Sequence, residues 1–517
     1  MPDTTGDSAY PLLVGDITVE RVGVVLHPDP HRVVGRPYLP GDDPVAEGKP
    51  RLERIVERVL AIPENEAKVH LEEITQRFAH RHRSLERLLH RNQEVVAHLL
   101  NGVSDERRLL VGAYLTHEYA FEAAALTNPS MVRAPKQSGL PAGATRFVLS
   151  LRAIGEGHLS SIEFRTGVTT ADGAVTLDPT ATTAETGERR PTVYERKFFS
   201  VKLNELGADH YLAARVLDQL PRLFNNDELQ QATAVLDDLP RAVSYETVKL
   251  IHWLAASNYV LEFEAGTALE ERLLWPEGPF ESRGMEDARF VHFGENDGTT
   301  TYYATYTAFD GSNILPQLIE TNDFRKFEIT TMNGSSVQNK GMALFPRQVG
   351  GRYLALSRPD RENIHLIASS DPRFWPTPST PLRRPTRPWE LIQMGNCGSP
   401  LETPEGWLVL THGVGPMRTY RLGLLLLDLD EPERVIAELP DPILEANEDE
   451  RDGYVPNVVY SCGGMIAGDH LLVPYGFSDR GTALARVSVP ELLDGLLAHR
   501  EARRTGRPAQ EPSSTDS

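Results

Sequence analysis

The stretch Glu281-Ser-Arg-Gly-Met-Glu-Asp-Ala-Arg-Phe290 leads directly into the strand-like run Phe290-Val-His-Phe293. It places two adjacent carboxylates, Glu286 and Asp287, between two arginines at the start of that strand. A proton donor that acts on an anionic or sugar-like substrate needs one acid to transfer the proton and cations that hold partners and tune its pKa. From these residues alone, a surface cluster of ion pairs is the simpler interpretation.

Short strand-like runs separated by turn residues extend the same pattern on both sides of this stretch. They are Phe147-Val-Leu-Ser-Leu151, Ser161-Ile-Glu-Phe164, Tyr259-Val-Leu-Glu-Phe263, Thr301-Tyr-Tyr-Ala-Thr-Tyr306, Tyr353-Leu-Ala-Leu356, Trp407-Leu-Val-Leu410 and Leu471-Leu-Val-Pro-Tyr475. Many short strands over roughly 350 residues indicate an all-β core whose edges must be closed off, and a propeller is one common solution. No strict sequence repeat defines the number of blades.

Two other regions show helical spacing. From Arg51 to about His117, apolar residues recur mostly at three- and four-residue steps, which predicts a helical hairpin or small bundle. Residues 209–257 return to the same spacing, which predicts a helical insertion. The tail after Arg500 is rich in Arg, Pro, Ser and Glu, so we expect it to be disordered.

Net charge, apolar runs and cysteine count exclude several classes of function for this chain. The chain has 517 residues and a net charge of -20, which argues against a nucleic-acid surface or an anionic membrane partner. It has no apolar run long enough to cross a bilayer and no secretory signal at its start, so we expect a cytoplasmic location. Cys397 and Cys462 are the only cysteines, so no disulfide framework and no thiolate zinc site are expected.

Taken together, the motifs of residues 128–489 resemble glycoside hydrolase family 130, the family of β-mannoside phosphorylases and related β-mannosidases. The matching elements are Glu286-Asp287-Ala288-Arg289, Gly341-Met-Ala-Leu-Phe-Pro346, Ser357-Arg358-Pro359, Gly406-Trp-Leu-Val-Leu-Thr-His412-Gly413-Val414, Val455-Pro-Asn-Val-Val459 and Tyr475-Gly-Phe-Ser-Asp479. The resemblance implies a five-bladed β-propeller over residues 121–495. We expect residues 1–120 and the insertion at about 209–257 to be accessory to it, and residues 496–517 to be a disordered tail.

The resemblance also implies an inverting, single-displacement reaction without a metal or organic cofactor. Asp287 matches the family's general acid, whose proton is thought to pass through the 3-hydroxyl of the sugar. Inorganic phosphate then attacks the anomeric carbon of a short β-mannoside and yields α-mannose 1-phosphate. Ordinary inverting enzymes need a second carboxylate to activate water, whereas phosphate needs cations and hydrogen-bond donors that hold it in line.

The resemblance assigns phosphate binding to Arg358, His412, Tyr420 and Lys340. Two positions depart from the family pattern. Ser357 replaces the usual histidine before the arginine, and Gln393 stands where many phosphorylases carry lysine. A glutamine can hydrogen-bond a phosphate oxygen but adds no charge, so weaker phosphate binding or a different specificity is expected.

The expected sugar-binding residues come from several parts of the chain. They are Asn128, Ser130, Arg152, Glu286, Asp310 and Asp479. Charged and amide side chains suit sugar hydroxyls, because a close-fitting polar site rejects epimers that leave its groups unpaired.

Two alternatives stay open. A hydrolase of the same fold would use water and a carboxylate such as Glu281 or Glu402 as its base. A glycan-binding or mannosyl-transferring protein would use the N-terminal helical region to select partners. We expect that region to build a homo-oligomer interface, since its apolar face needs cover, with cover for the propeller as the other use.

Overall fold

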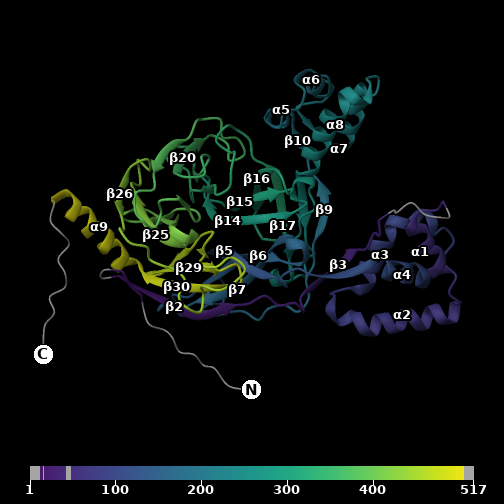
Figure 1. Ribbon diagram of the computed structural model, residues 1–517, viewed down its shortest axis with the longest axis horizontal. Coiled ribbons are helices and arrows are strands. Elements are labelled where there is room, and N and C mark those ends of the chain that lie inside the picture. The colour runs from purple at the N-terminus through teal and green to yellow at the C-terminus, as the bar shows by residue number, and fades with distance from the viewer. Residues whose placement is uncertain (1–11, 15–16, 42–47, 506–517) are drawn as a thin grey trace.

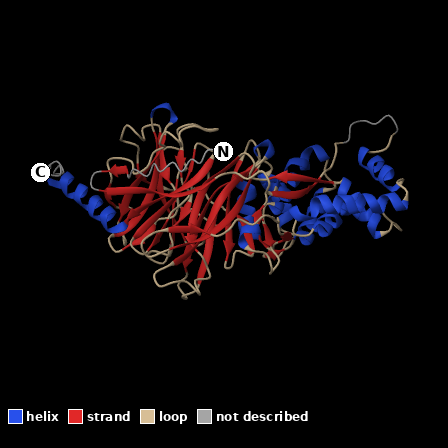
Figure 2. Cartoon of the chain, turned by 90° about the horizontal axis from the view of Figure 1, so that it is seen from below, coloured by secondary structure: helices blue, strands red, loops and turns tan. Residues whose placement is uncertain are grey.

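The computed structural model describes residues 12–14, 17–41 and 48–505 of the chain. The strands gather in one β domain, as Figure 1 shows. Two helical regions project from one side of this domain, and the C-terminal helix leaves on the other side (Figure 2). No helix among the described residues is long and apolar enough to span a membrane.

Most described strands fall into five antiparallel units along the chain, numbered here in that order. The first unit is β5 (Ala125–Arg133), β6 (Thr145–Ile154), β7 (Ser160–Thr169) and β8 (Val175–Leu177), with β13 (Leu273–Leu274) also on β7. The second is β14 (Gly284–Gly294), β15 (Thr300–Phe309), β16 (Ile314–Thr321) and β17 (Lys326–Thr331), extended by β12 (Tyr259–Glu262) and β9 (Glu188–Pro191). A single parallel pair, Gly284 with Ser160, joins these two units.

The other three units follow in sequence. The third is β18 (Ala343–Leu344), β19 (Tyr353–Ser357), β20 (Ile364–Ser369) and β21 (Thr380–Arg383). The fourth is β22 (Gln393–Asn396), β24 (Gly406–Val414), β25 (Tyr420–Leu427) and β26 (Val435–Glu438), with β23 (Leu401–Thr403) on β24. The fifth is β27 (Val459–Tyr460), β29 (His470–Phe477), β30 (Gly481–Ser488), β2 (Ile17–Leu26) and β1 (Leu12–Val14), with β28 (Met465–Ala467) on β29.

The fifth unit contains strands from both the N-terminal and the C-terminal part of the described chain. β2 pairs antiparallel with β30, with Val19 opposite Val487, and the two strands lie side by side in Figure 1. The expectation that residues 1–120 are only accessory is therefore wrong for β1 and β2. In Figure 1 the five units follow one another around a common centre.

Strand alternation explains why the units stack face to face. Leu408 and Leu410 of β24 join a core shared with β29 and β2, whereas Trp407 and Val409 point to the opposite face and join a core shared with β19. Successive side chains of a strand point to opposite faces, so a strand that is apolar at every position feeds two cores at once. The apolar run of β24 therefore requires a sheet on each side.

The helical regions have cores of their own. The N-terminal region contains α1 (Arg51–Leu60), α2 (Glu64–Phe78), η1 (Ala79–Arg81), α3 (Leu85–Gln93), η2 (Glu94–Leu99) and α4 (Asp105–Tyr114), and it joins the β domain through β3 (Val33–Pro37) and β4 (Thr116–Ala120). The insertion contains β10 (Tyr194–Glu195), α5 (Arg196–Glu205), α6 (His210–Leu217), β11 (Leu223–Phe224), α7 (Asn226–Thr233), η4 (Ala234–Leu236) and α8 (Arg241–Ala256). Four short 3₁₀ turns complete the elements: η3 (Glu156–His158), η5 (Leu269–Glu271), η6 (Pro279–Glu281) and η7 (Pro416–Arg418).

Two predicted boundaries differ from the structure. The helices of the insertion begin at Arg196, earlier than the predicted start at 209. The C-terminal helix α9 (Val489–Thr505) buries Leu492 and Leu496 against the β domain, so the expectation of disorder from residue 496 is wrong for residues 496–505. Burial of these leucines stabilises a helix whose flanking composition suggested disorder. Residues 506–517 lie outside the described part.

A buried quartet of charges, defined as Arg32, Glu122, Glu163 and Arg165, ties the segment before β3 to β7. Each side chain is at most 3% exposed. Arg32 pairs with Glu122 at 2.9 Å and also with Glu163, while Arg165 pairs with Glu163 at 2.8 Å and with Glu122 at 3.2 Å. Two carboxyl groups face two guanidinium groups, so each buried guanidinium has its partners inside the quartet.

Candidate active site

Asp287 sits on a distorted part of β14. The register of β14 against β15 shifts between Glu286 and Arg289, which marks a β-bulge. Asp287 has φ of 57°, in the left-handed region that residues other than glycine seldom adopt. A bulge re-aims a side chain out of the ladder, and strained backbone of this kind concentrates at functional positions.

The neighbouring strand β5 carries a matching distortion. Its register shifts between Thr127 and Ser130, and Asn128 has φ of 50°. The amide Nδ2 of Asn128 donates a hydrogen bond to Oδ1 of Asp287. Ser130 is fully buried, and its Oγ accepts a hydrogen bond of 3.1 Å from the backbone N–H of Phe290. In the described structure Ser130 therefore fastens β5 to β14 just beyond the acid.

Three cations surround the two carboxylates, and we call these five residues the acid cluster: Glu286, Asp287, Arg152, Arg289 and Lys340. Arg152 donates to Oε1 of Glu286 at 2.7 Å, and Nζ of Lys340 donates to Oε2 of the same carboxylate. Nη1 of Arg289 donates to the backbone carbonyl of Asp287 at 2.8 Å, and Nη2 lies 3.9 Å from Oδ2 of Asp287.

These cations control the charge of Asp287. Burial would raise the pKa of its carboxyl group, but the charges of Arg289, Lys340 and Arg152 and the hydrogen bond from Asn128 lower the pKa below its ordinary value. Asp287 is therefore a carboxylate in the free chain at neutral pH.

A second group, the cationic group, consists of Arg358, His412 and Tyr420. Nη1 of Arg358 donates to Nε2 of His412 at 3.0 Å, and the ring of His412 stacks on that of Tyr420 with centroids 6.1 Å apart. Burial and the charges of Arg358 and Arg289 hold the pKa of His412 well below its ordinary value, so the imidazole is neutral and its Nε2 can accept. Nε of Arg358 and Nδ1 of His412 are buried without a hydrogen-bond partner among the described residues.

Gly395 allows the arginine and histidine to come this close. A Cβ atom at this position would lie 2.6 Å from Cε1 of His412 and 3.2 Å from Nη1 of Arg358. Any side chain larger than hydrogen would displace the pair. Gln393, two residues earlier on β22, donates from Nε2 to the hydroxyl of Tyr420 at 3.5 Å, so the position that departs from the family pattern does border this group.

Tyr460 joins the two groups. Its hydroxyl accepts a hydrogen bond of 2.8 Å from Nη2 of Arg289, and its ring centroid lies 4.9 Å from that of His412. Sequence reasoning missed Tyr460, although it directly follows the quoted motif that ends at Val459. A chain of contacts from Asp287 through Arg289, Tyr460 and His412 therefore reaches Arg358.

Asp479 lies near the acid cluster. It has φ of 48° in the turn between β29 and β30. Burial raises the pKa of its carboxyl group, Arg152 and Arg418 lower it, and Asp287 and Glu286 raise it, with a net shift upward. Among the described residues, the charges that act on Asp479 are thus those of the acid cluster and of Arg418, a further arginine that sequence reasoning did not select.

Asp310 is not joined to the acid cluster. Its carboxylate accepts hydrogen bonds from the backbone N–H groups of Ser312 and Asn313 and from the side chain of Asn313, so it caps the turn after β15. The same arrangement recurs one unit later, where Asp360 accepts from the backbone of Asn363 and from its side chain. The repeated contacts indicate a structural turn, and a role for Asp310 in substrate binding stays a prediction.

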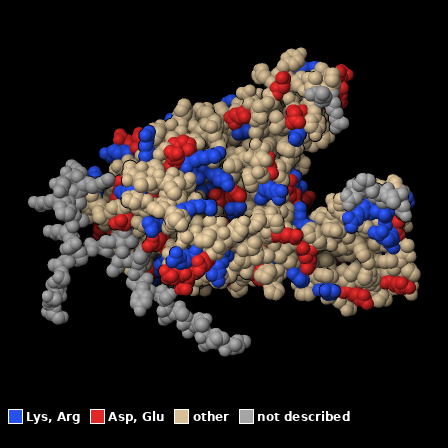
Figure 3. Space-filling view, in the orientation of Figure 1, with Lys and Arg blue, Asp and Glu red and all other residues tan. Residues whose placement is uncertain are grey.

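The two groups lie at corresponding ends of strands. Arg152, Asp310, Arg358, Val414 and Asp479 all lie at or just beyond the end of the second main strand of their unit, which is β6, β15, β19, β24 or β29. Contacts and charge interactions among residues from all five units, joined through Tyr460, then place those strand ends at one face of the β domain. Figure 3 shows basic and acidic side chains mixed over the middle of the β domain in the view drawn there.

The two carboxylates considered as alternative bases lie elsewhere. Glu281 is fully buried, and its carboxylate accepts hydrogen bonds from Tyr259, Tyr306 and the backbone N–H groups of Glu277 and Gly278. Glu402 pairs with Arg347 at the surface at 2.7 Å. Glu281 therefore supports a loop, and Glu402 belongs to an exposed ion pair. Neither contacts the acid cluster.

Comparisons with known proteins agree with the sequence motifs. A family model described as glycoside hydrolase 130, β-1,4-mannooligosaccharide phosphorylase, matches residues 252–497. The 1,2-β-oligomannan phosphorylase of Thermoanaerobacter sp. is 33% identical over 236 residues, which cover 43% of this chain and 75% of that protein. The β-1,2-mannobiose phosphorylase of Listeria innocua is 28% identical over 279 residues, or 53% of this chain and 75% of that protein.

Solved structures include the β-1,2-mannobiose phosphorylase from Listeria innocua in complex with β-1,2-mannobiose. It has 21% sequence identity and a TM-score of 0.44, covering 72% of this chain and 92% of that one. The motif carrying Asp287 and the identity to curated relatives lead to one assignment: this chain belongs to glycoside hydrolase family 130, the family of mannoside phosphorylases.

Proposed function

We propose that the chain is an inverting phosphorylase that cleaves a short β-mannoside with inorganic phosphate and releases α-mannose 1-phosphate. The observation that carries this proposal is the pairing of one acid cluster with one cationic group across Tyr460. Among the described residues, no carboxylate pairs with Arg358 or His412, so that side is suited to an anion and not to a base. An oxyanion would supply acceptors for the buried Nε of Arg358 and for Nδ1 of His412, which carries the proton because Nε2 accepts from Arg358.

We assign the roles that the family resemblance implies. Asp287 donates the proton, through the 3-hydroxyl of the mannosyl residue, to the glycosidic oxygen. Arg358, His412, Tyr420 and Lys340 bind phosphate and hold it in line with the anomeric carbon, which replaces the second carboxylate of an ordinary inverting enzyme. The substrate-binding residues are Asn128, Ser130, Arg152, Glu286, Asp310 and Asp479, with Ser130 acting by positioning β5.

Phosphate binding also prepares the acid. In the free chain the nearby cations keep Asp287 ionised. A phosphate dianion beside Lys340 and Arg289 offsets those charges, which raises the pKa of Asp287 and favours its protonated form. Asp287 is therefore protonated, and able to donate its proton, when phosphate is bound.

We infer a five-bladed β-propeller for the β domain. The five antiparallel units, the alternate cores between them and the pairing of β2 with β30 support this architecture. A ring closed by strands from both chain ends leaves no exposed edge between the fifth and first units. The cytoplasmic location and the homo-oligomer stay predictions.

The test is a phosphorolysis assay with the full chain. Curated relatives are named for β-1,2- and β-1,4-linked mannosides, so β-1,2-, β-1,3- and β-1,4-mannobiose are incubated with and without inorganic phosphate. We expect α-mannose 1-phosphate from at least one of them, and only with phosphate. Release of mannose without phosphate supports a β-mannosidase, and binding without turnover supports a glycan-binding or mannosyl-transferring protein.

A matched variant ties the assay to the site. Arg358→Gln removes charge-assisted hydrogen bonds to phosphate, which are worth about 1.5–3 kcal/mol, so the KM for phosphate should rise about 10- to 100-fold. The KM for the mannoside should change little. An unchanged KM for phosphate would remove Arg358 from the phosphate site.

A further inference from the structure

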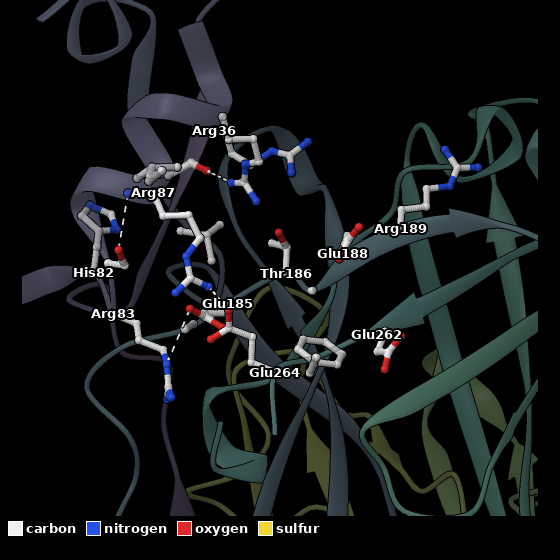
Figure 4. Close-up of a pocket in the computed structure, with 18 of the residues that line it drawn as sticks. Arg36, His82, Arg83, Arg87, Glu185, Thr186, Glu188, Arg189, Glu262 and Glu264 are labelled. Atoms are coloured by element: carbon white, nitrogen blue, oxygen red, sulfur yellow. Dashed lines mark hydrogen bonds and ion pairs between the residues drawn. The ribbon is translucent and has the colours of Figure 1, made fainter. Parts of the chain in front are cut away.

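A cavity lies where the N-terminal helical region meets the β domain. Its volume is about 680 Å³, and it shares no residue with the acid cluster or the cationic group. One wall comes from β3 and α3, and the opposite wall from residues 184–190 and β12. Figure 3 shows the helical regions as two lobes separated by a notch, and Figure 4 shows the side chains that converge in the cavity.

Most cations of this cavity are matched by carboxylates. Arg83 pairs with Glu271 at 2.7 Å, and Arg87 pairs with Glu264, and these two pairs hold the two walls together. Arg190 lies 3.0 Å from Glu188 within the same wall. Together the pairs leave little net charge at that end of the cavity.

Arg91 is an exception, and Arg36 has only one carboxylate partner, at a longer distance. The guanidinium of Arg36 stacks 4.6 Å from the ring of Trp275 and pairs with Glu277 at 3.5 Å. Arg91 donates to the carbonyl of Gly35 at 3.4 Å, and no carboxylate in the described part of the chain pairs with it. Burial and the charge of Arg91 lower the pKa of Arg36, whereas Glu277 raises it, with a net decrease. The two guanidinium groups are thus close enough to interact, and Glu277 is the one described carboxylate that pairs with either of them.

Such a pair suits an oxyanion. Planar guanidinium groups bind phosphate with paired hydrogen bonds, and stacking on Trp275 together with the bond to Gly35 positions both arginines before a ligand arrives. Bringing a dianion between them would also relieve their mutual repulsion. The cavity is far larger than one phosphate, so the anion is part of a larger molecule.

The rest of the cavity is polar. Thr186, Glu188 and Glu262 lie along the wall away from Arg36, as Figure 4 shows, and they offer a hydroxyl group and carboxylate oxygens. Hydroxyl-rich ligands need acceptors of this kind. We propose that this cavity binds a phosphorylated polyol, such as a sugar phosphate, with its phosphate between Arg36 and Arg91 and its hydroxyl groups toward Thr186 and Glu262. This site is separate from the proposed function and does not depend on it.

Isothermal titration calorimetry with glucose 6-phosphate tests the site on the full chain. Arg358→Gln serves as the background, because it weakens oxyanion binding at the other centre. We expect one binding event in this background, at least about tenfold tighter than for inorganic phosphate and absent with glucose. Arg91 is exposed, so its substitution should be tolerated. Adding Arg91→Gln to this background should weaken the binding of glucose 6-phosphate about tenfold or more. Arg36→Gln should do the same.

Arg190→Gln is the matched control, because Arg190 borders the same cavity but already pairs with Glu188 and Glu262. Its affinity for glucose 6-phosphate should stay within about threefold of the background. Glucose 6-phosphate would contact both the N-terminal helical region and the β domain, so it should also raise the thermal unfolding midpoint of the Arg358→Gln background. It should not raise the midpoint of the variant that also carries Arg91→Gln. No binding, equal binding of inorganic phosphate, or binding unaffected by Arg91→Gln would each overturn the proposal.

Discussion

The buried quartet and the acid cluster both combine carboxyl groups with cationic side chains and both involve strands of the first unit, yet they differ in two ways. In the quartet, Arg32 and Arg165 each face both carboxylates, and the side chains are at most 3% exposed. In the acid cluster, Lys340 is 33% exposed and Arg152 is 19% exposed. The quartet is closed on itself, whereas the acid cluster opens toward solvent.

Backbone geometry is the second difference. Glu163 and Arg165 lie in regular register with β6, opposite Leu151 and Leu149. Asp287 and Asn128 both lie on β-bulges with positive φ. Regular strands suffice to bury mutually paired charges, whereas Asp287 and Asn128 lie on distorted backbone that the rest of the fold must stabilise. Opposite charges on neighbouring strands therefore do not by themselves mark an active site.

The largest expected effect separates the two clusters by activity. Asp287→Asn should lower kcat for phosphorolysis about 10²- to 10⁴-fold, because the amide cannot donate the proton of a general acid, while mannoside binding is retained. Asp428→Asn makes the same chemical change in an exposed turn, where Asp428 pairs with Arg434, and should leave kcat unchanged. Initial rates of α-mannose 1-phosphate release measure both. Near-normal turnover of Asp287→Asn would remove the assigned acid.

The next effect separates the clusters by stability. Glu163→Gln should destabilise the chain by about 3–5 kcal/mol, because it leaves two buried guanidinium groups with only the carboxyl group of Glu122 as an acidic partner. Glu402→Gln, which breaks the exposed pair with Arg347, should cost at most about 1 kcal/mol. Urea unfolding followed by circular dichroism compares the two variants. Equal shifts of the two midpoints would contradict a structural role for the quartet.

A third prediction concerns pH. Burial, together with the charge of Glu163, raises the pKa of Glu122 from 4.5 to about 8. The folded chain therefore binds more protons than the unfolded chain between these values, so this group's contribution to stability is complete below pH 4.5 and is lost as the pH rises to about 8. The loss is at most about 1.4 kcal/mol per pH unit.

Unfolding free energies measured at several pH values between 5 and about 8 check this. Glu122→Gln cannot titrate, so its stability should fall less steeply over the same range than that of the unsubstituted chain. If the unfolding free energy depended on pH equally in the two proteins, Glu122 would be ionised in the folded chain, as Asp287 is. The quartet and the acid cluster would then not differ in this property.

The smallest expected effect concerns an additional positive charge beside the cationic group. Gln393→Lys adds a cation beside Tyr420, so the KM for phosphate should fall about 3- to 10-fold. Gln348→Lys, at a position that bonds Asn296 away from the site, is the control and should leave that KM unchanged. Phosphate saturation curves at fixed mannoside measure both variants. A rise in KM on Gln393→Lys would mean that the glutamine itself binds phosphate.

Local patterns were sufficient for most elements. The strands around Phe147, Tyr353 and Trp407 and the helices from Arg51 follow periodicities that are visible within a few residues. β2 was missed, because it is regularly buried only near Ile17 and Val19 and its partner β30 lies at the other end of the chain. A pairing between distant segments leaves no trace in a short window of sequence.

The site divides in the same way. Asp287, Arg358 and His412 could be selected because each lies in a motif of adjacent residues. Tyr460 could not, because its role depends on the contact with Arg289, and the pairing of Arg36 with Arg91 arises only where α3 packs beside β3.

The order of residues was enough to identify the family, to select Asp287 as the candidate acid and to predict the alternation of strand and helix, because these depend on contiguous residues. Only the tertiary structure showed that the charges of the quartet are buried against one another and that those of the acid cluster are partly exposed. The physical reason is that burial and the strength of an ion pair depend on distances between segments far apart in the chain, and only packing fixes those distances.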